Sequence, residues 1–276
     1  MKNKILYVSD LDGTLLRSDQ TLSNYTVDIL NSLAERGLIF SYATARSYYT
    51  SSIVTAGLDA KIPVIVYNGT FILENGTRKQ LLSHSFSAQE AEEITKIMTD
   101  GGVYPIVYSQ LDGAEKYFYC PTLISRQTED FLKTRRGDGR ENEVESADML
   151  CQGDVFHFSC VDSAEKLFSV YEKLKYRFPS VYYKEIYSGE WWLEVHPIGV
   201  SKANAVTELK RLMGCDKVVC FGDGKNDISM FHTADECYAV ENADPELKKI
   251  ATAVIEGNND DGVAKWLEQM AAKMGF

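Results

Sequence analysis

Short apolar runs rich in β-branched and aromatic residues alternate with helical patterns at the start of the chain, from about residue 5 to residue 80. The pattern predicts strands at 5–9, 38–43 and 64–67, with helices at 23–36 and 48–56 between them. Ser23 is a suitable N-cap for the first helix, and Gly37 stops it. Strands that alternate with helices in this way are typical of a parallel β-sheet.

The same alternation returns at residue 201. It predicts a helix at 201–213, a strand at 217–221, a helix after residue 226, a strand at 238–240 and a last helix that begins at Asp244-Pro245-Glu246. Several of the predicted strands are nearly continuous in apolar or small residues, which is expected of central strands covered on both faces. We therefore expect an α/β fold with a doubly wound, Rossmann-like parallel sheet.

The segment between these two blocks follows a different pattern. It predicts helices at 89–99, 122–133 and 163–176, and strands at 104–108, 116–120, 155–161, 181–186 and 191–195. Neighbouring strands joined by short turns, such as the one at Ser188-Gly189, indicate an antiparallel α+β module. We expect a core domain at 1–84 and 196–276 with this module inserted as a cap domain at 85–195. The charged stretch 135–145 is expected to be a solvated loop of the cap.

Charge and composition exclude several classes of protein. A net charge of −11 over 276 residues opposes binding to nucleic acid, which needs clustered basic residues. No apolar stretch near the N-terminus is long enough for a signal peptide or a membrane span, so we expect a cytoplasmic protein with no membrane contact. The six cysteines form no C-x-x-C pair and are expected to be reduced thiols.

Two aspartates stand at the end of the first predicted strand. Residues two apart on an extended chain project to the same side, so Asp10 and Asp12 are expected to emerge together where open α/β sheets bind ligands. Gly13 permits the sharp turn that follows. One carboxylate of such a pair can act as nucleophile or metal ligand while the other donates a proton. Aspartate and glycine are also ordinary turn formers, so this motif alone leaves both interpretations open.

Three further strand ends or helix starts carry polar groups. Thr44-Ala45-Arg46 follows the second strand, where a hydroxyl and backbone amides suit a phosphate but would equally cap the next helix. Lys202 lies in the first turn of a helix, where a lysine is usually just solvated. Because its charge opposes the helix dipole there, a functional role gains support. Asp223 and Asp227 flank a glycine turn after a later strand, and such a pair suits a hard cation that prefers oxygen ligands.

Together these motifs resemble the haloacid dehalogenase superfamily, and specifically its Cof-type branch of sugar-phosphate-like phosphatases. The resemblance is carried by DLDGTLL at residues 10–16, by Thr44, by Lys202 and by GDGKNDISMF at residues 222–231. It also includes Asn68-Gly69 and the tail from Ala239 to Gly262. Over the cap it rests only on size and on the order of the elements.

The resemblance implies a Mg²⁺-dependent phosphoric monoester hydrolase acting on small phosphorylated metabolites. Asp10 would form an aspartyl phosphate, and Asp12 would be the general acid and base. Mg²⁺ would be held by Asp10, the Asp12 backbone carbonyl and Asp223, with Asp227 beside it. The phosphoryl oxygens would be held by Thr44, Lys202, Asn226 and the backbone amides near Leu11 and Ala45. Ala45 and Ala203 stand where the branch usually has glycine.

The substrate depends on the cap in this architecture. Candidate specificity residues are Arg46 in the core, and Tyr119, Lys184, Glu190, Trp191 and Trp192 in the cap. Alternation along the strand places the two tryptophans on opposite faces, so one of them is expected to be core, without indicating which. Two alternative functions remain: a phosphomutase with the same aspartyl phosphate, and a non-catalytic sensor of a phosphorylated metabolite. No Walker A, H-E-x-x-H or G-x-S-x-G motif supports another enzyme class.

Overall fold

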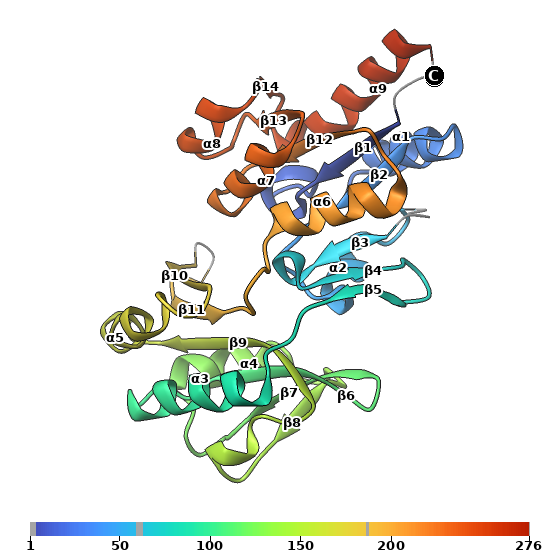
Figure 1. Ribbon diagram of the computed structural model, residues 1–276. Helices are drawn as coiled ribbons and strands as arrows, with labels where there is room; N and C mark the ends of the chain where they lie inside the picture. Colours follow the sequence, from blue (N-terminus) through green and yellow to red (C-terminus); the bar gives the residue numbers. More distant parts are fainter. Residues whose placement is uncertain (1–3, 59–62, 186–187, 276) are drawn as a thin grey trace. The chain divides into compact units, whose positions relative to one another are not determined.

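Two compact units make up the chain. The computed structural model describes residues 4–58, 63–185 and 188–275. One unit combines Met1–Ser83 with Val200–Phe276, and we call it the core; the other is His84–Gly199, and we call it the cap (Figure 1). The chain therefore leaves the core once, forms the cap and returns.

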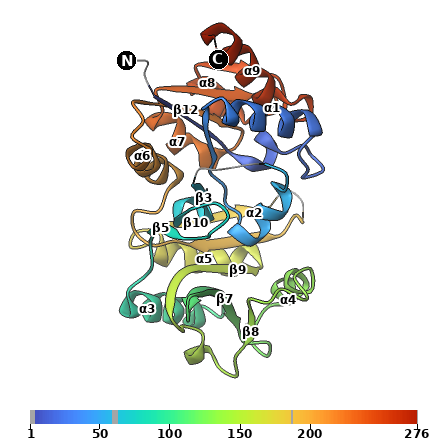
Figure 2. The same ribbon diagram turned by 90° about the vertical axis from the view of Figure 1, so that its right-hand side faces the viewer.

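The core is built on a five-stranded parallel sheet. Its strand order is β14-β13-β12-β1-β2, and the strands are β1 (Ile5–Ser9), β2 (Ile39–Tyr42), β12 (Lys217–Gly222), β13 (Glu236–Val240) and β14 (Ala253–Ile255). Helices α1 (Asn24–Glu35) and α9 (Gly262–Met274) cover one face, and α6 (Lys202–Met213) and α7 (Ile228–Thr233) cover the other (Figures 1 and 2). The predicted doubly wound α/β fold is confirmed.

Local capping explains where the core helices begin. The Ser23 side chain accepts a hydrogen bond from the Thr26 amide at the start of α1, and Ser201 accepts one from the Asn204 amide at the start of α6. Helix α8 (Pro245–Ile250) has Pro245 in its first turn behind the Asp244 cap. The chain therefore enters these helices where the sequence predicted.

A small antiparallel sheet completes the core. It contains β3 (Val64–Val66), β4 (Phe71–Leu73) and β5 (Gln80–Ser83). A single bridge between Ala43 and Ile65 connects it to the end of β2. Of these strands only β3 was predicted, from its run of β-branched residues. Helix α2 (Tyr48–Val54) lies between β2 and β3 along the chain.

The cap contains a six-stranded sheet with the order β10-β11-β9-β6-β7-β8. Its elements are α3 (Ala88–Asp100), β6 (Ile106–Leu111), β7 (Ala114–Tyr119), α4 (Arg126–Lys133), β8 (Glu141–Glu143), β9 (Asp154–Asp162), α5 (Ala164–Leu174), β10 (Ser180–Lys184) and β11 (Trp191–Val195). All pairings are antiparallel except that of β7 with β8. The predicted strand 181–186 ends at Lys184, and Ile186 lies outside the described residues.

The two tryptophans of β11 have different surroundings. Trp191 packs against the apolar core of the cap, and its ring stacks on Tyr182 with the centroids 4.7 Å apart. Trp192 meets the Phe131 ring of α4 edge to face at 4.9 Å. Both tryptophans are half-buried, and Trp191 is the one that packs against the apolar core of the cap, which the sequence pattern left open.

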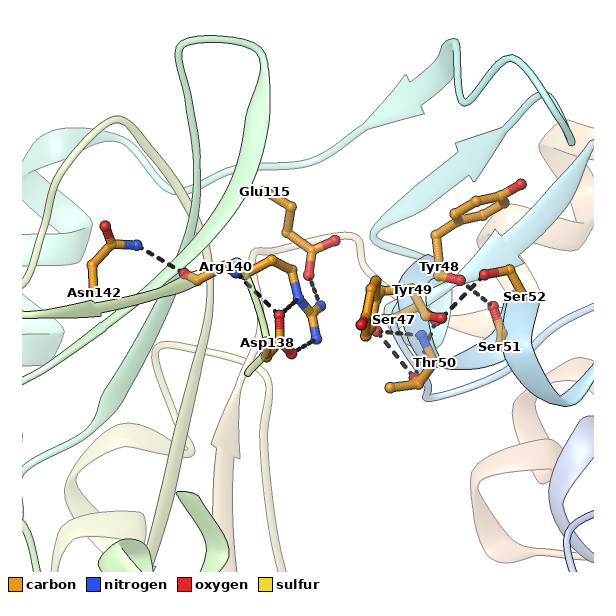
Figure 3. Close-up of polar contacts among 10 residues, drawn as sticks. All are labelled: Ser47, Tyr48, Tyr49, Thr50, Ser51, Ser52, Glu115, Asp138, Arg140 and Asn142. Atoms are coloured by element: carbon orange, nitrogen blue, oxygen red, sulfur yellow. Dashed lines mark hydrogen bonds and ion pairs between the residues drawn. The ribbon is translucent and has the colours of Figure 1, made fainter. Parts of the chain in front are cut away.

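The prediction of a solvated loop at 135–145 is wrong in part. Within it, Glu141–Glu143 forms β8 at the edge of the cap sheet. The Arg140 guanidinium donates to the carboxylates of Asp138 and Glu115, and only 13% of the Arg140 side chain is exposed (Figure 3). A charged sequence suggests exposure, but here opposite charges pair and bury one another.

The described residues also show the length of the helices and the state of the cysteines. Among the described residues, no helix is long and apolar enough to cross a membrane. All six cysteines are free, and four of them are buried.

Candidate active site

Asp10 lies directly after β1, at the carboxyl end of a central strand. Its backbone amide donates to the Phe221 carbonyl of β12, which continues the sheet pairing to this residue. The chain then turns sharply at Gly13, where φ is +75°. A Cβ atom on Gly13 would lie 2.3 Å from Asp223 Oδ2, so only glycine allows the turn and the aspartate to approach each other.

Lys202 joins two carboxylates in the interior of the core. Its Nζ donates to Asp10 Oδ1 at 2.6 Å and to Asp227 Oδ1 at 2.7 Å, and the residue is only 2% exposed. The start of α6 reaches this place because Gly69 has no side chain: a Cβ there would lie 2.4 Å from the Ser201 carbonyl oxygen. Lys202 therefore reaches the site from the start of α6, whereas the two carboxylates that it bonds follow β1 and β12.

Asp227 anchors the loop after β12. Its Oδ2 accepts hydrogen bonds from the Asp223 and Gly224 amides, both at 3.1 Å. Asp223 in turn accepts a hydrogen bond from the Thr14 hydroxyl at 3.1 Å. Ligand oxygens of Asp10, Asp223 and Asp227 all lie within 4.8 Å of one another. Three predicted acids are therefore brought together in one cluster, and the Asp12 carboxylate is not part of it.

Burial makes this acidic cluster electrostatically unfavourable. Burial raises the pKa of Asp10 well above its ordinary value, although the Lys202 charge opposes the rise. Burial, followed by the charge of Asp227, raises the pKa of Asp223 to about 6. Burial alone would lower the pKa of Lys202, but Asp10 and Asp227 outweigh it and raise that pKa. One lysine therefore faces three carboxylates, and the cluster lacks positive charge.

A divalent cation fits this set of donors. Mg²⁺ prefers oxygen ligands, and one or two carboxylates commonly hold it together with the phosphate of a substrate. Asp10 and Asp223 each offer a carboxylate oxygen to the cluster, whereas Asp227 uses both oxygens to bind Lys202 and two amides. These contacts favour Asp10 and Asp223 as direct ligands, with Asp227 holding the surrounding groups in place.

Asp12 lies beside the cluster and pairs with an arginine. Arg46 donates from Nε to Asp12 Oδ2 at 2.7 Å and from Nη2 to Asp12 Oδ1 at 2.5 Å. The Asp12 side chain remains 36% exposed. Arg46 was predicted as a specificity residue, and its contact with Asp12 was not anticipated.

The other predicted phosphate ligands have local structural contacts. Thr44 is buried, and its hydroxyl accepts a hydrogen bond from the Arg46 amide at 3.1 Å, whereas the cap of the next helix, α2, is Ser47. Leu11 is buried, and its carbonyl accepts from Leu16 to close the turn. Ala45 and Asn226 are exposed. The structure thus leaves the phosphate-binding role of these residues as a prediction.

Two residues that support the site were missed by the sequence analysis. Thr14 bonds Asp223, and Asn242 donates from Nδ2 to the Gly13 carbonyl at 2.7 Å. Thr14 belongs to the first motif and Asn242 to the tail that supported the resemblance, so both lay within recognised segments. The sequence patterns did not indicate that Thr14 would bond Asp223 or that Asn242 would bond the turn after Asp10.

The predicted cap residues do not form one group. Lys184 is exposed and Glu190 half-buried, whereas Tyr119 is buried and donates to Glu141 Oε1 at 2.6 Å. Trp192 is half-buried. None of these observations identifies a ligand of the cap.

A polar cluster in the cap was not predicted. Tyr183 donates to Glu194 Oε1 at 3.4 Å, and His196 Nε2 lies 3.6 Å from Glu194 Oε2. His157 Nε2 is 4.0 Å from Oε1 of the same glutamate. Burial, with a smaller effect of His196, lowers the pKa of His157 to about 3, so this imidazole is neutral near pH 7. His157 lies on β9, Tyr183 on β10 and Glu194 on β11, and His196 follows β11 directly.

The chain is similar in sequence to a known family of hydrolases and to phosphatases from several bacteria. A sequence model of haloacid dehalogenase-like hydrolases matches residues 7–267. A 5-amino-6-(5-phospho-D-ribitylamino)uracil phosphatase of Bacillus subtilis is 28% identical, with 95% of this chain and 96% of that protein covered. An HMP-PP phosphatase of Serratia proteamaculans is 27% identical, with 87% and 85% covered.

A solved structure has the same fold. A haloacid dehalogenase-like hydrolase from Bacteroides thetaiotaomicron superposes with a TM-score of 0.79 at 24% identity, over 97% of this chain and 99% of the other. The likeness includes the parallel sheet of the core and the inserted mixed sheet of the cap.

Proposed function

We propose that this chain, which belongs to the haloacid dehalogenase-like hydrolase family, is a Mg²⁺-dependent phosphatase that hydrolyses small phosphorylated metabolites through an aspartyl phosphate on Asp10. Membership confirms the family that the motifs resembled. The observation that carries the proposal is the cluster of Asp10, Asp223 and Asp227 at the carboxyl ends of β1 and β12, in which Lys202 bonds Asp10 and Asp227. A nucleophile, cation ligands and a fixed positive charge are thereby combined in one place.

The reaction follows in two displacements. In the first, a carboxylate oxygen of Asp10 bonds to phosphorus, the bond from phosphorus to the ester oxygen breaks, and Asp12 gives its proton to the departing oxygen. In the second, Asp12 takes a proton from water as the water oxygen bonds to phosphorus. The bond between Asp10 and phosphorus then breaks, and inorganic phosphate leaves.

Positive charge must offset the negative charge that develops on the phosphoryl oxygens. Mg²⁺ held by Asp10, Asp223 and the Asp12 carbonyl would supply most of it. Lys202 has three N–H groups, and two of them donate to carboxylates in the described part of the chain. The third can donate to a phosphoryl oxygen, with Thr44, Asn226 and the amides near Leu11 and Ala45 completing the contacts.

The relatives narrow the substrate class without naming the substrate. One acts on a phosphorylated ribitylamino-pyrimidine and another on HMP-PP, by their names. Both substrates are small, phosphorylated and polar. A panel of such esters, assayed for release of inorganic phosphate, is the first experiment. Formation of an isomeric phosphate ester without free phosphate would instead identify a phosphomutase.

Metal dependence is the most direct test of the acidic cluster. Excess chelator should abolish turnover, and added Mg²⁺ should restore it. Ca²⁺ should inhibit, because its looser coordination allows Asp10 to bind through both oxygens and spoils the in-line attack. Phosphate release is measured over a titration of each cation. Full activity in excess chelator would rule out the magnesium assignment.

The cap is proposed to select substrates without taking part in the chemistry. Trp192→Ala and Lys184→Ala should change the order in which substrates are preferred while leaving the Mg²⁺ dependence unchanged. Trp191→Phe is the matched control, since Trp191 packs against the apolar core of the cap. The measurement is kcat/KM for each member of the panel. An equal loss on every substrate, with the fold intact, would place Trp192 or Lys184 among the catalytic residues.

A further inference from the structure

Arg46 and Asp12 form a two-point ion pair that has no part in the two displacements described above. The guanidinium donates one hydrogen bond to each oxygen of the carboxylate, at 2.7 Å and 2.5 Å. Gln20 Oε1 accepts a further hydrogen bond from Nη2 at 2.8 Å. A carboxylate held at both oxygens has a defined plane, whereas one held at a single oxygen can rotate.

The backbone around Arg46 is also fixed. Its amide donates to Thr44 Oγ1 at 3.1 Å, and its carbonyl accepts a hydrogen bond from the Tyr67 amide at 3.0 Å. The Asp12 end of the pair begins the Gly13 turn, whose glycine carbonyl is bonded by Asn242. Both partners therefore come from rigid segments, 34 residues apart in the sequence.

We propose that Arg46 is a positioning residue, which orients the Asp12 carboxylate for proton transfer to the departing oxygen and from the attacking water. This inference rests on the proposed function. Each carboxylate oxygen has two lone pairs, and Arg46 uses one on each. The remaining positions then point in fixed directions: in the acid form one of them carries the proton that passes to the departing oxygen, and in the base form the same position accepts a proton from water. Proton transfer is sensitive to such placement, because a displacement of 1 Å can cost on the order of 10²-fold in rate.

A direct contact between Arg46 and the substrate is the competing explanation, and a double-mutant cycle separates the two. The variants are Arg46→Ala, Asp12→Asn and the combination of both, assayed with a sugar phosphate that the wild type hydrolyses. If Arg46 acts through Asp12, Arg46→Ala should lower kcat on the order of 10²-fold with little change in KM. The double variant should be no slower than Asp12→Asn alone.

Two further variants test the two-point geometry. Arg46→Lys keeps the charge but cannot bond both oxygens, so it should recover less than about a tenth of the lost kcat. Arg17→Ala is the matched control, since Arg17 makes a similar two-point pair with Asp261 in the same unit. It should leave kcat within about twofold of the wild type. Thermal unfolding of each variant shows whether the fold is retained.

The outcomes are distinct. A raised KM for Arg46→Ala, with losses that multiply in the double variant, would show substrate binding and overturn the inference. Wild-type kcat for Arg46→Lys would overturn it as well, because charge alone would suffice. If Asp12→Asn is slow but Arg46→Ala is not, only this inference fails. If Asp12→Asn is as fast as the wild type, the proposed function fails with it.

Discussion

Replacing Asp10 with asparagine should reduce phosphate release to the uncatalysed background for every substrate. Asparagine keeps the shape of the side chain and an oxygen that can accept the hydrogen bond from Lys202, but its amide cannot attack phosphorus. No phosphoryl group should be found on the enzyme at any time. The measurement is phosphate release from several esters, together with mass spectrometry of acid-quenched protein.

A loss of this size is informative only if the variant folds. Circular dichroism and thermal unfolding should match those of the wild type within a few degrees. Asp28→Asn is a matched control, since Asp28 is an exposed aspartate on α1 and should leave turnover unchanged. Residual turnover of Asp10→Asn by even a few per cent of the wild type, after deamidation is excluded, would show that another group is the nucleophile.

Replacing Asp12 with asparagine should separate the two displacements. With a sugar phosphate, whose departing oxygen needs a proton, the first displacement should slow by roughly 10²–10⁴-fold. With p-nitrophenyl phosphate, the departing group needs no proton, so the aspartyl phosphate should form quickly and then persist. Stopped-flow absorbance should show a burst of nitrophenolate near one equivalent of enzyme, followed by slow turnover.

The contrast between the two substrates is the critical feature of this prediction. A general loss of structure would slow both substrates alike and give no burst. Wild-type rates on both would show that Asp12 is neither the acid nor the base. A sensor that only binds phosphorylated metabolites would give no turnover with the wild type at all.

Local signals explain why most of the core could be predicted. Ser23, Ser201 and Pro245 are recognised from their own neighbourhoods, since capping depends on residues within one turn. Three strand ends and one helix start could be placed at one edge of the sheet, because parallel strands in such folds share that edge. Their meeting brought Asp10, Lys202, Asp223 and Asp227 together as expected.

Several short strands that depend on pairing with a neighbouring strand were missed. Strand β8 has three residues, of which two are glutamates, and it forms only because β7 offers a free edge. Strand β4 pairs with β3 on one side and with β5 on the other. A short segment without periodicity carries no pattern to recognise.

The contact between Arg46 and Asp12 could not be predicted for a related reason. Alternation along the strand gave the direction in which Asp12 projects, but not the side chain that meets it. That partner comes from the turn after β2, where its backbone amide bonds Thr44 and its guanidinium also bonds Gln20. The motifs placed Arg46 near the site, and the structure adds that its guanidinium bonds the Asp12 carboxylate.

The central claim is that Asp10 becomes phosphorylated during turnover. Wild-type enzyme and Asp12→Asn should be mixed with p-nitrophenyl phosphate and Mg²⁺, quenched in acid within milliseconds to seconds, digested and examined by mass spectrometry. We expect a phosphoryl group on Asp10, in a low fraction of the wild type and close to one equivalent in the variant. Phosphate release without any phosphoryl group on the protein, or a phosphoryl group on a different residue, would contradict the mechanism.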